Sequence, residues 1–346
     1  MEFLVKSNYS KIFSIVIPVH NSSSFIKDNI LSLIGLDFPT VNFEVIFVDD
    51  ASSDDSVDAI AEVLNFYGAK FEYQILRNEN PAGPGIARNA GISSAKGDWI
   101  LFLDSDDQFI PNALSVLAKN INEQNVGSDL DLIFFDGLKL GSLDSVPIII
   151  CKHSCVVDKS HAKKKHHEEI RSVLRLEFDE HVIFCAFSRK FIKSSELKFE
   201  PGIYEDVLFI SQALILSRHQ IHINQSLYIK VSRENQITGS FTMRHAESYL
   251  QSRKKIWEWL KIQRNVSHEE FIPDFHFGVR GAMGILYRRS STEISPHLRI
   301  EFDSQLTRIA VDFFQDFEKI ISGQHATELD LVCFSRYQQL VALGVL

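Results

Sequence analysis

Short apolar runs alternate with amphipathic segments over the first hundred residues of the chain. Each run is five or six residues long and mostly apolar, which is typical of buried strands. Between the runs, apolar residues recur every three or four positions, which is the period of a helix. The predicted strands are 13–17, 43–48, 71–76 and 99–103, and the predicted helices include 26–34, 57–64 and 86–95.

Strands that alternate with helices predict an α/β fold, with a mainly parallel sheet between two layers of helices. In such sheets, ligands bind beyond the carboxyl ends of the strands. The residues that follow three of the strands are mostly polar or acidic: Pro18-Val19-His20-Asn21, Asp49-Asp50 and Asp104-Ser105-Asp106-Asp107. We therefore expect a polar and acidic rim along one edge of the sheet.

Beyond Asp107 the alternation is less regular. Pro111 predicts the first turn of a helix that continues to about Lys119, and 130–135 is a further predicted strand. From about Met243 the chain is predicted to be helical. One long helix is expected from the apolar stripe at Leu298, Phe302, Leu306, Ile309, Phe313, Phe317 and Ile320. We place a domain boundary near residue 240, before a helical C-terminal region at 241–346.

The composition narrows the class of protein. The 346 residues are 45% hydrophobic and 23% charged, as in globular domains, and the net charge of −9 argues against a general nucleic-acid binder. No apolar run approaches the roughly 20 residues that span a bilayer. The N-terminal segment is also too short and too polar for a signal peptide. We therefore expect a cytoplasmic protein, with peripheral contact at the inner membrane face left open.

Four cysteines are too few and too scattered for a disulfide framework, which fits a reducing compartment. Two of them alternate with a histidine, at Cys151, His153 and Cys155. This spacing matches no common structural zinc site, so the role of these three residues stays open.

The acidic run at 104–107 is the strongest candidate for chemistry. Alternate residues of an extended segment point the same way, so Asp104 and Asp106 can converge on one site. Mg²⁺ and Mn²⁺ prefer a few carboxylates, with phosphate oxygens and water at the remaining positions. The alternative is a solvated acidic turn before the helix near Pro111, and the run alone does not decide between them.

Two other features accompany the acidic run. At Asp49-Asp50, one carboxylate can accept a hydrogen bond from a base or a ribose hydroxyl, while the serines that follow cap a helix. Arg88 lies one turn into the helix after the glycine-rich loop 81–85, where it can meet a diphosphate or position a sugar. The alternative for Arg88 is an ordinary surface arginine. The loop follows the third strand rather than the first and lacks a third glycine, which argues against a dinucleotide-binding fold.

Glu205 and Asp206 open a predicted helix further along the chain. Acidic residues at a helix N-terminus offset the helix dipole, and the residues alone favour that interpretation. The functional alternative makes one of them a general base that takes a proton from an acceptor hydroxyl.

Taken in order, four motifs resemble the inverting glycosyltransferase family two, which has a GT-A fold. They cover about the first 110 residues almost continuously, with weaker likeness at 185–191, 199–209 and 228–240 and little beyond 241. The motifs are Ser14-Ile-Val-Ile-Pro18-Val-His20-Asn21, Val48-Asp49-Asp50-Ala-Ser-Ser-Asp54, Gly85-Ile-Ala-Arg88-Asn89-Ala-Gly91 and Gly97-Asp-Trp-Ile-Leu-Phe-Leu-Asp104-Ser-Asp106-Asp107.

The resemblance implies a GT-A domain over 1–240, in which 1–110 binds a nucleotide-sugar and 111–240 forms the acceptor side. Arg88 would face the donor phosphate or sugar, Asp104 the ribose or donor sugar, and Asp106 would hold Mn²⁺ or Mg²⁺ together with Asp104. The residues implied to line the nucleotide pocket are Pro18, His20, Asn21, Asp49 and Asp50. Asp49 would read the base, and His20 stands where the family more often has tyrosine.

The resemblance also implies an activity. Asp206, supported by Glu205, would deprotonate an acceptor hydroxyl, and the sugar would move with inversion from a nucleotide-sugar, most simply a UDP-sugar. The implied acceptor is a glycan or lipid-linked saccharide in surface-polysaccharide synthesis. The C-terminal helices, with Arg253-Lys254-Lys255 and Arg288-Arg289, would then dock to membrane or to a second subunit. A plain helical core is the favoured interpretation of their apolar stripes.

Two other classes of protein stay open. A sugar nucleotidyltransferase also binds a metal–nucleotide complex, but it would carry a glycine-rich basic motif where this chain has Pro18-Val19-His20-Asn21. A non-catalytic nucleotide-sugar or glycan-binding protein would keep the pocket without turnover. The acidic residues at Asp104, Asp106 and Asp206 argue against that class.

Overall fold

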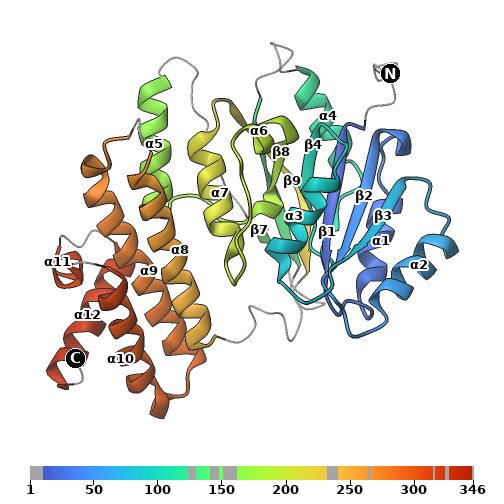
Figure 1. Cartoon of the computed structure of the whole chain (residues 1–346). Helices are drawn as coiled ribbons and strands as arrows, with labels where there is room; N and C mark the ends of the chain where they lie inside the picture. The colour runs from blue at the N-terminus through green and yellow to red at the C-terminus, as the bar shows by residue number, and fades with distance from the viewer. Residues whose placement is uncertain are drawn as a thin grey trace. The chain divides into compact units, whose positions relative to one another are not determined.

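The computed structural model describes residues 11–123, 130–140, 148–150, 162–231, 241–263, 266–314, 316–323 and 327–344. At 148–150 and 162–165 it describes the backbone only. The chain forms two compact units (Figure 1). The first unit is Met1–Val156 with Asp179–Ser232, and the second is Val157–Phe178 with Arg233–Leu346. The described residues 162–178 thus group with the C-terminal helices rather than with the domain predicted over 1–240. The functional domain boundaries stay a prediction.

The first unit is built on a nine-stranded sheet in the order β3-β2-β1-β4-β8-β6-β9-β5, with β7 paired to β6. Its first part is parallel and follows the predicted alternation. The strands are β1 (Phe13–Val19), β2 (Phe43–Asp49), β3 (Glu72–Arg77) and β4 (Trp99–Phe102), and the helices between them are α1 (Ile26–Ile34), α2 (Ser56–Phe66) and α3 (Pro84–Ser94). Helix α3 packs against β1 and β2, while α1 and α2 pack on each other. The α/β prediction is confirmed for this part of the chain.

The rest of the sheet is mixed rather than parallel. Strand β8 lies between β4 and β6 and runs antiparallel to both, and β9 is parallel to β6 and antiparallel to β5. The strand–helix alternation ends after β4, so nothing forces the later strands to be parallel. The later elements of this unit are β5 (Gln108–Phe109), α4 (Ala113–Glu123), β6 (Leu132–Leu140), β7 (Ile148–Ile150), β8 (Cys185–Ser188), α6 (Arg189–Ser194), α7 (Glu205–Leu216) and β9 (Gln220–Val231), with short 3₁₀ turns η1 (Thr40–Asn42) and η2 (Val182–Phe184).

Strand β1 continues through Pro18, where the sequence analysis ended it. Pro18 pairs with Val48 of β2, but the ladder between β1 and β4 stops at Val16 and Phe102. Proline has no N–H to donate, so it is tolerated where a neighbouring strand has already ended. The chain leaves β4 at this level, and the carboxyl ends of β1 and β4 separate at the point where the strand order reverses. Ligands bind at such a point in open α/β sheets.

The second unit is helical, and helix α9 (Ile272–Glu293) lies at its centre. It packs against α5 (Ala162–Leu174), α8 (Met243–Lys261), α10 (Pro296–Phe313), α11 (Phe317–Ile321) and α12 (Glu328–Ala342), and it follows a short 3₁₀ turn η4 (His268–Phe271). The single long helix predicted over 298–320 is wrong. Helix α10 ends at Phe313, and Asp316 has a left-handed backbone with φ of 58° before α11 begins.

Buried ion pairs hold the second unit together. Arg280 of α9 donates to Asp330 of α12 at 3.0 Å and to the carbonyl of Ile320 at 3.0 Å. Arg336 pairs with the buried Asp303. Among the helices that the structure describes, none is long and apolar enough to cross a membrane.

Two glycines of α9 give a matched test of this packing. A Cβ at Gly278 would lie 1.7 Å from the carbonyl oxygen of Leu174, whereas one at Gly281 would meet only the Leu176 side chain at 3.5 Å. We expect Gly278→Ala to lower the free energy of unfolding by about 1–3 kcal/mol through overpacking. Gly281→Ala should leave it unchanged or raise it by up to about 1 kcal/mol, because alanine favours helices. Urea unfolding followed by circular dichroism measures both, and equal midpoints would contradict the packing described.

Candidate active site

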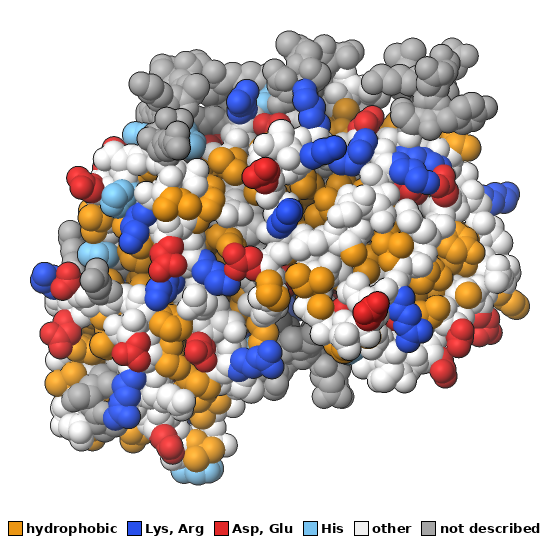
Figure 2. Space-filling view, viewed as in Figure 1, with side chains coloured by type: hydrophobic (Ala, Val, Ile, Leu, Met, Phe, Trp, Pro, Cys, Tyr) orange, Lys and Arg blue, Asp and Glu red, His pale blue; other side chains and the backbone are white. Residues whose placement is uncertain are grey.

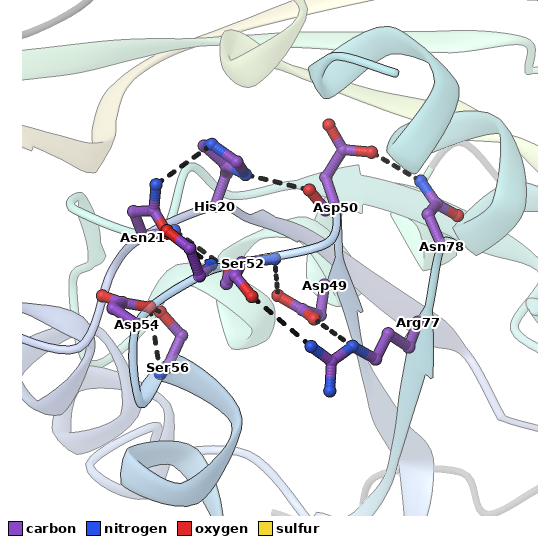
Figure 3. Close-up of polar contacts among 10 residues, drawn as sticks. His20, Asn21, Asp49, Asp50, Ser52, Asp54, Ser56, Arg77 and Asn78 are labelled. Atoms are coloured by element: carbon purple, nitrogen blue, oxygen red, sulfur yellow. Dashed lines mark hydrogen bonds and ion pairs between the residues drawn. The ribbon is translucent and has the colours of Figure 1, made fainter. Parts of the chain in front are cut away.

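Polar side chains at the ends of β1 and β2 form the first part of the rim (Figure 3). Asp49 is fully buried. Its Oδ1 accepts a hydrogen bond from the backbone N–H of Ser52 at 3.1 Å, and its Oδ2 pairs with Nε of Arg77 at 3.1 Å. Arg77 was not among the predicted residues. The register of the two parallel strands would have indicated it, because Asp49 of β2 and Arg77 of β3 are direct partners.

Asp50 orders the loop that leads into α3. Its carboxylate accepts hydrogen bonds from the backbone N–H groups of Ala82 and Gly83, at 3.0 and 2.7 Å, and from the side-chain amide of Asn78 at 2.7 Å. Gly83 has φ of 91°, a conformation that favours glycine. The carboxylate thus determines where the N-terminus of α3 lies.

His20 lies exposed on the same rim, with its ring held at both nitrogens (Figure 3). Nδ1 lies 2.9 Å from the carbonyl oxygen of Asp50, and Nε2 lies 3.2 Å from the side-chain nitrogen of Asn21. A neutral ring with its proton on Nδ1 satisfies both contacts, because it donates to the carbonyl and accepts from the amide. Asn21 itself accepts from the N–H of Ser53 at 2.9 Å, which fixes the amide that holds the ring.

The acidic loop after β4 is anchored from two sides. The side-chain amide of Asn29 on α1 donates to the carbonyl oxygens of Asp104 and Asp107, at 3.0 and 2.9 Å. The hydroxyl of Tyr228 on β9 donates to Asp107 at 2.7 Å and accepts from the N–H of Asp104 at 3.2 Å. Asp107 also accepts from the N–H of Val231 at 2.8 Å. Asn29 and Tyr228 were not predicted, because nothing in their local sequence marks a contact so distant along the chain.

The three carboxylates of the loop differ in exposure. Asp107 is buried, and Asp104 and Asp106 are partly exposed. Burial, together with the neighbouring Asp104 and Asp106 carboxylates, raises the pKa of Asp107 to about 7. A cation bound beside Asp104 and Asp106 would offset this repulsion. Among the described residues there is no group of three or more potential metal-ligating side chains. A metal here would therefore need oxygen ligands from a phosphate and water as well.

Arg88 joins the acidic loop to helix α7. It is buried, which excludes the surface-arginine alternative. Its Nη2 donates to Oδ1 of Asp104 at 2.9 Å, and its Nη1 donates to Oε1 of Glu205 at 2.5 Å. The guanidinium also lies over the rings of Phe102 and Phe199, 6.0 and 5.5 Å from their centroids. Although burial acts in the opposite direction, the Asp104 and Glu205 carboxylates raise the pKa of Arg88, so it stays charged.

Two glycines of α3 make this arrangement sterically possible. A Cβ at Gly85 would lie 2.7 Å from Cγ of Glu205, and one at Gly91 would lie 2.3 Å from Cγ1 of Val16. Helix α3 therefore approaches both β1 and the start of α7 closely, with Arg88 between the two contacts. The spacing Gly85-x-x-Arg88-x-x-Gly91 follows from these contacts on successive turns of one helix.

Glu205 and Asp206 lie at the first turn of α7, after Tyr204 with φ of 59°. Burial raises the pKa of both carboxyl groups. For Glu205, the charge of Arg88 opposes this rise and that of Asp206 adds to it. For Asp206, His181 and Arg88 oppose the rise, while Asp104 and Glu180 add to it. His181 and Glu180 were not predicted, because their segment carries no motif that the sequence analysis singled out.

The remaining predicted features lie elsewhere. Cys151, His153 and Cys155 fall outside the described residues. In the C-terminal helices, Arg253 is buried, Arg288 pairs with Glu328 at 2.9 Å, and Arg289 pairs with Glu293 at 2.7 Å. On the face drawn in Figure 2, basic and acidic side chains are interspersed. Docking of these helices to membrane or to a second subunit stays a prediction.

The curled mixed sheet, its flanking helices and the acidic loop after β4 are those of a GT-A glycosyltransferase fold. The model of the family "Glycosyl transferase family 2" matches residues 14–194, and the chain belongs to that family.

The chain is similar to known relatives over different shares of its length. The poly(ribitol-phosphate) beta-glucosyltransferase of Bacillus spizizenii is 45% identical over 103 residues, which cover 29% of this chain and 16% of that protein. The first curated relatives are thus matched over less than a quarter of their length. The minor teichoic acid biosynthesis protein GgaA of Bacillus subtilis is 28% identical over 332 residues, or 92% of this chain and 69% of that protein.

Solved structures share the fold at low sequence identity. Residues 1–349 of Staphylococcus aureus TarS, in complex with UDP-GlcNAc, superpose with a TM-score of 0.56 and 20% identity, over 91% of this chain and 93% of that one. The mannosyltransferase PcManGT of Pyrobaculum calidifontis, in complex with GDP-Man and Mn²⁺, gives a TM-score of 0.54 at 14% identity, over 96% and 88% of the two chains.

The buried ion pairs of Arg88 predict a large loss of stability when the cation is removed. Arg88→Met leaves the buried Glu205 carboxylate without its cation and should lower the free energy of unfolding by about 3–5 kcal/mol. Adding Glu205→Gln should recover part of the loss, since the unpaired charge is then removed. Lys96→Met, which breaks an exposed pair with Glu72, should hardly move the urea midpoint. Equal shifts for Arg88→Met and Lys96→Met would contradict the buried pairing.

Proposed function

We propose that this chain is a metal-dependent inverting glycosyltransferase of surface-polysaccharide synthesis. It moves a sugar from a UDP-sugar to a hydroxyl of a glycan or lipid-linked saccharide. The observation that carries the proposal is the pair of contacts made by Arg88, which joins Asp104 of the acidic loop to the first turn of α7. These contacts support the proposal because they join the proposed donor-binding acid to the helical turn that carries Asp206, the proposed base.

The nucleotide binds at the ends of β1 and β2 in this proposal. The exposed ring of His20 stacks on the base, and Pro18 lies at the end of the same strand. Asp49 is fully buried, so in this proposal it contributes to base recognition by fixing Ser52 and Arg77. Asn21 and Asp50 act mainly by holding the His20 ring and the loop before α3. The UDP-GlcNAc complex of TarS supports a uridine nucleotide.

Asp104 and Asp106 would hold Mn²⁺ or Mg²⁺ when the donor binds. The metal, when bound, offsets the negative charge that builds on the nucleoside diphosphate as it leaves. The Mn²⁺ complex of PcManGT, another protein of this fold, supports the assignment. Arg88 fixes one oxygen of Asp104, so the carboxylate presents its other oxygen to the donor.

Asp206 is the catalytic base. Its carboxylate takes the proton of the acceptor hydroxyl while that oxygen bonds to the anomeric carbon, and the bond from that carbon to the diphosphate oxygen breaks. A single displacement of this kind inverts the anomeric configuration. A base works best when its pKa lies near the working pH, and burial moves the pKa of Asp206 upward in that direction. Glu205 keeps Arg88, and thereby the acidic loop, in place beside it.

In this proposal the acceptor side lies in residues 111–240, where the likeness to the family is weaker than over 1–110. The relatives named for poly(ribitol-phosphate) glucosyl transfer and for teichoic acid biosynthesis support a polyol-phosphate or saccharide acceptor of the cell surface. In this proposal the enzyme acts in the cytoplasm on a cytoplasmic nucleotide-sugar, with peripheral contact at the inner membrane face and no role for nucleic acid.

A panel of nucleotide-sugars tests the proposed donor. Thermal unfolding is measured with UDP-, GDP- and TDP-sugars, each with and without Mn²⁺. A UDP-sugar should raise the melting temperature only with the metal, since a ligand at a hundred times its Kd stabilises by about 2.7 kcal/mol. Release of UDP is then assayed for each sugar that stabilises. Stabilisation by none of the nucleotide-sugars would overturn the enzyme proposal and favour another class.

Two substitutions separate donor binding from proton transfer. Asp206→Asn should lower the rate of sugar transfer by about 10²–10⁴-fold, because the base is lost. It should retain the Mn²⁺-dependent thermal shift. Asp106→Ala should lose both activity and the shift. Asp28→Asn, an exposed acid on α1, serves as the control and should change neither. Full activity in Asp206→Asn would show that the base lies elsewhere.

A further inference from the structure

We propose that Ser22 and Ser105 are positioning residues, whose hydroxyl groups form a bridge between the two halves of the proposed donor site. One half is the nucleotide segment 20–23 after β1, and the other is the acidic loop after β4. The bridge sets the separation at which the two halves bind a single nucleoside diphosphate together with its metal. The inference rests on the proposed function, since it concerns the same donor.

The side chain of Ser22 reaches from the nucleotide segment to the acidic loop. Its Oγ lies 2.9 Å from Oγ of Ser105, the residue between the two acids proposed to hold the metal. It also lies 3.3 Å from the carbonyl oxygen of His20. A serine hydroxyl donates one hydrogen bond and can accept others. Both contacts are satisfied when Ser105 donates to Ser22 and Ser22 donates to the carbonyl of His20.

The start of α2 fixes Ser22 from the other side. Ser22 is fully buried, and its backbone N–H donates to Oγ of Ser56 at 2.6 Å. The hydroxyl of Ser56 donates in turn to Asp54 (Figure 3). Asp54 also accepts from the backbone N–H of Ser23 at 3.0 Å. The nucleotide segment therefore sets the position of the Ser22 hydroxyl, and the acidic loop meets it through Ser105.

The bridge lies where strand pairing no longer joins the two halves. The ladder between β1 and β4 ends at Val16 and Phe102, and both serines follow this point in the chain. The side chains that hold the backbone of the acidic loop come from α1 and β9, not from the nucleotide segment. The hydroxyl pair thus joins the acidic loop directly to the segment that carries His20.

The effect of the bridge should appear when both halves are occupied. UDP alone requires the nucleotide segment, whereas UDP with Mn²⁺ requires that segment and the acidic loop at one fixed separation. Without the bridge, the complex with both ligands must order this separation as it forms, which costs affinity. The net contribution of one hydrogen bond corresponds to about 2–10-fold in an equilibrium constant. We therefore expect the bridge to increase, by about this factor, the extent to which Mn²⁺ strengthens UDP binding.

Calorimetric titration with UDP, in the presence and absence of saturating Mn²⁺, tests the bridge in the full chain. Ser22→Ala and Ser105→Ala should each lower the ratio of the two UDP affinities by about 2–10-fold. The affinity for UDP alone should stay nearly unchanged in both variants. The double variant should lose no more than either single variant, because both changes remove the same hydrogen bond.

Two other serines provide matched controls. Ser52→Ala removes a hydrogen bond within the nucleotide half, where Oγ of Ser52 accepts from the N–H of Asn21 at 3.0 Å. It should weaken UDP binding equally with and without Mn²⁺, so the ratio should not change. Ser93 is exposed on α3, and its hydroxyl donates to the carbonyl of Asn89 at 2.9 Å. Ser93→Ala should change neither affinity.

Circular dichroism and the urea midpoint show whether each variant is folded. Ser105 is only partly buried, so Ser105→Ala tests the bridge even where Ser22→Ala unfolds the chain. A merely structural role would weaken UDP binding with and without Mn²⁺ alike and leave the ratio at the wild-type value.

The outcomes separate failure of the inference from failure of the proposed function. A wild-type ratio in Ser22→Ala and Ser105→Ala would overturn the inference while the proposed function stands. Additive losses in the double variant would also overturn it, since the two hydroxyl groups would then act independently. A wild-type chain that binds no UDP even with Mn²⁺ would overturn the proposed donor, and the bridge with it.

Discussion

The site depends on one buried guanidinium. Arg88 lies between two carboxylates that belong to different parts of the first unit, Asp104 at the end of β4 and Glu205 at the start of α7. A buried cation is costly unless it is paired, and here each carboxylate also relies on it for charge compensation. The pairing therefore fixes the separation of the acidic loop and α7, and any chemistry that uses both requires this arginine.

Close backbone packing is what allows the guanidinium to reach both partners. Helix α3 carries glycine one turn before and one turn after Arg88, and any side chain there would collide with Glu205 or Val16. Asp50 adds a second constraint, since its carboxylate holds the loop from which α3 starts. The motif Gly85-x-x-Arg88-x-x-Gly91 thus determines the position of α3 as well as the contacts of Arg88. On the opposite side, Tyr228 and Asn29 hold the backbone of the acidic loop.

The sequence predicted the part of the fold that local periodicity encodes. The first four strands, the helices between them and the rim formed by Asp49, Asp50 and the acidic loop follow from alternation and from the geometry of parallel sheets. The antiparallel insertion of β8 did not follow, because strand order after β4 depends on contacts distant in the sequence. The break between α10 and α11 was missed because apolar spacing continues through Asp316, whose backbone conformation the spacing does not report.

The same reasoning explains which residues of the candidate site could be indicated by sequence motifs. Asp104, Asp106 and Arg88 stand in motifs, whereas Arg77 reaches the site through strand register and Tyr228 reaches it from β9. Their contacts divide the acidic groups into two sets. Asp107 accepts hydrogen bonds from β9, whereas Asp104 and Asp106 stay partly exposed. Burial raises the pKa of Asp206, and charges of both signs act on its carboxyl group, with His181 and Arg88 opposing the rise and Asp104 and Glu180 adding to it.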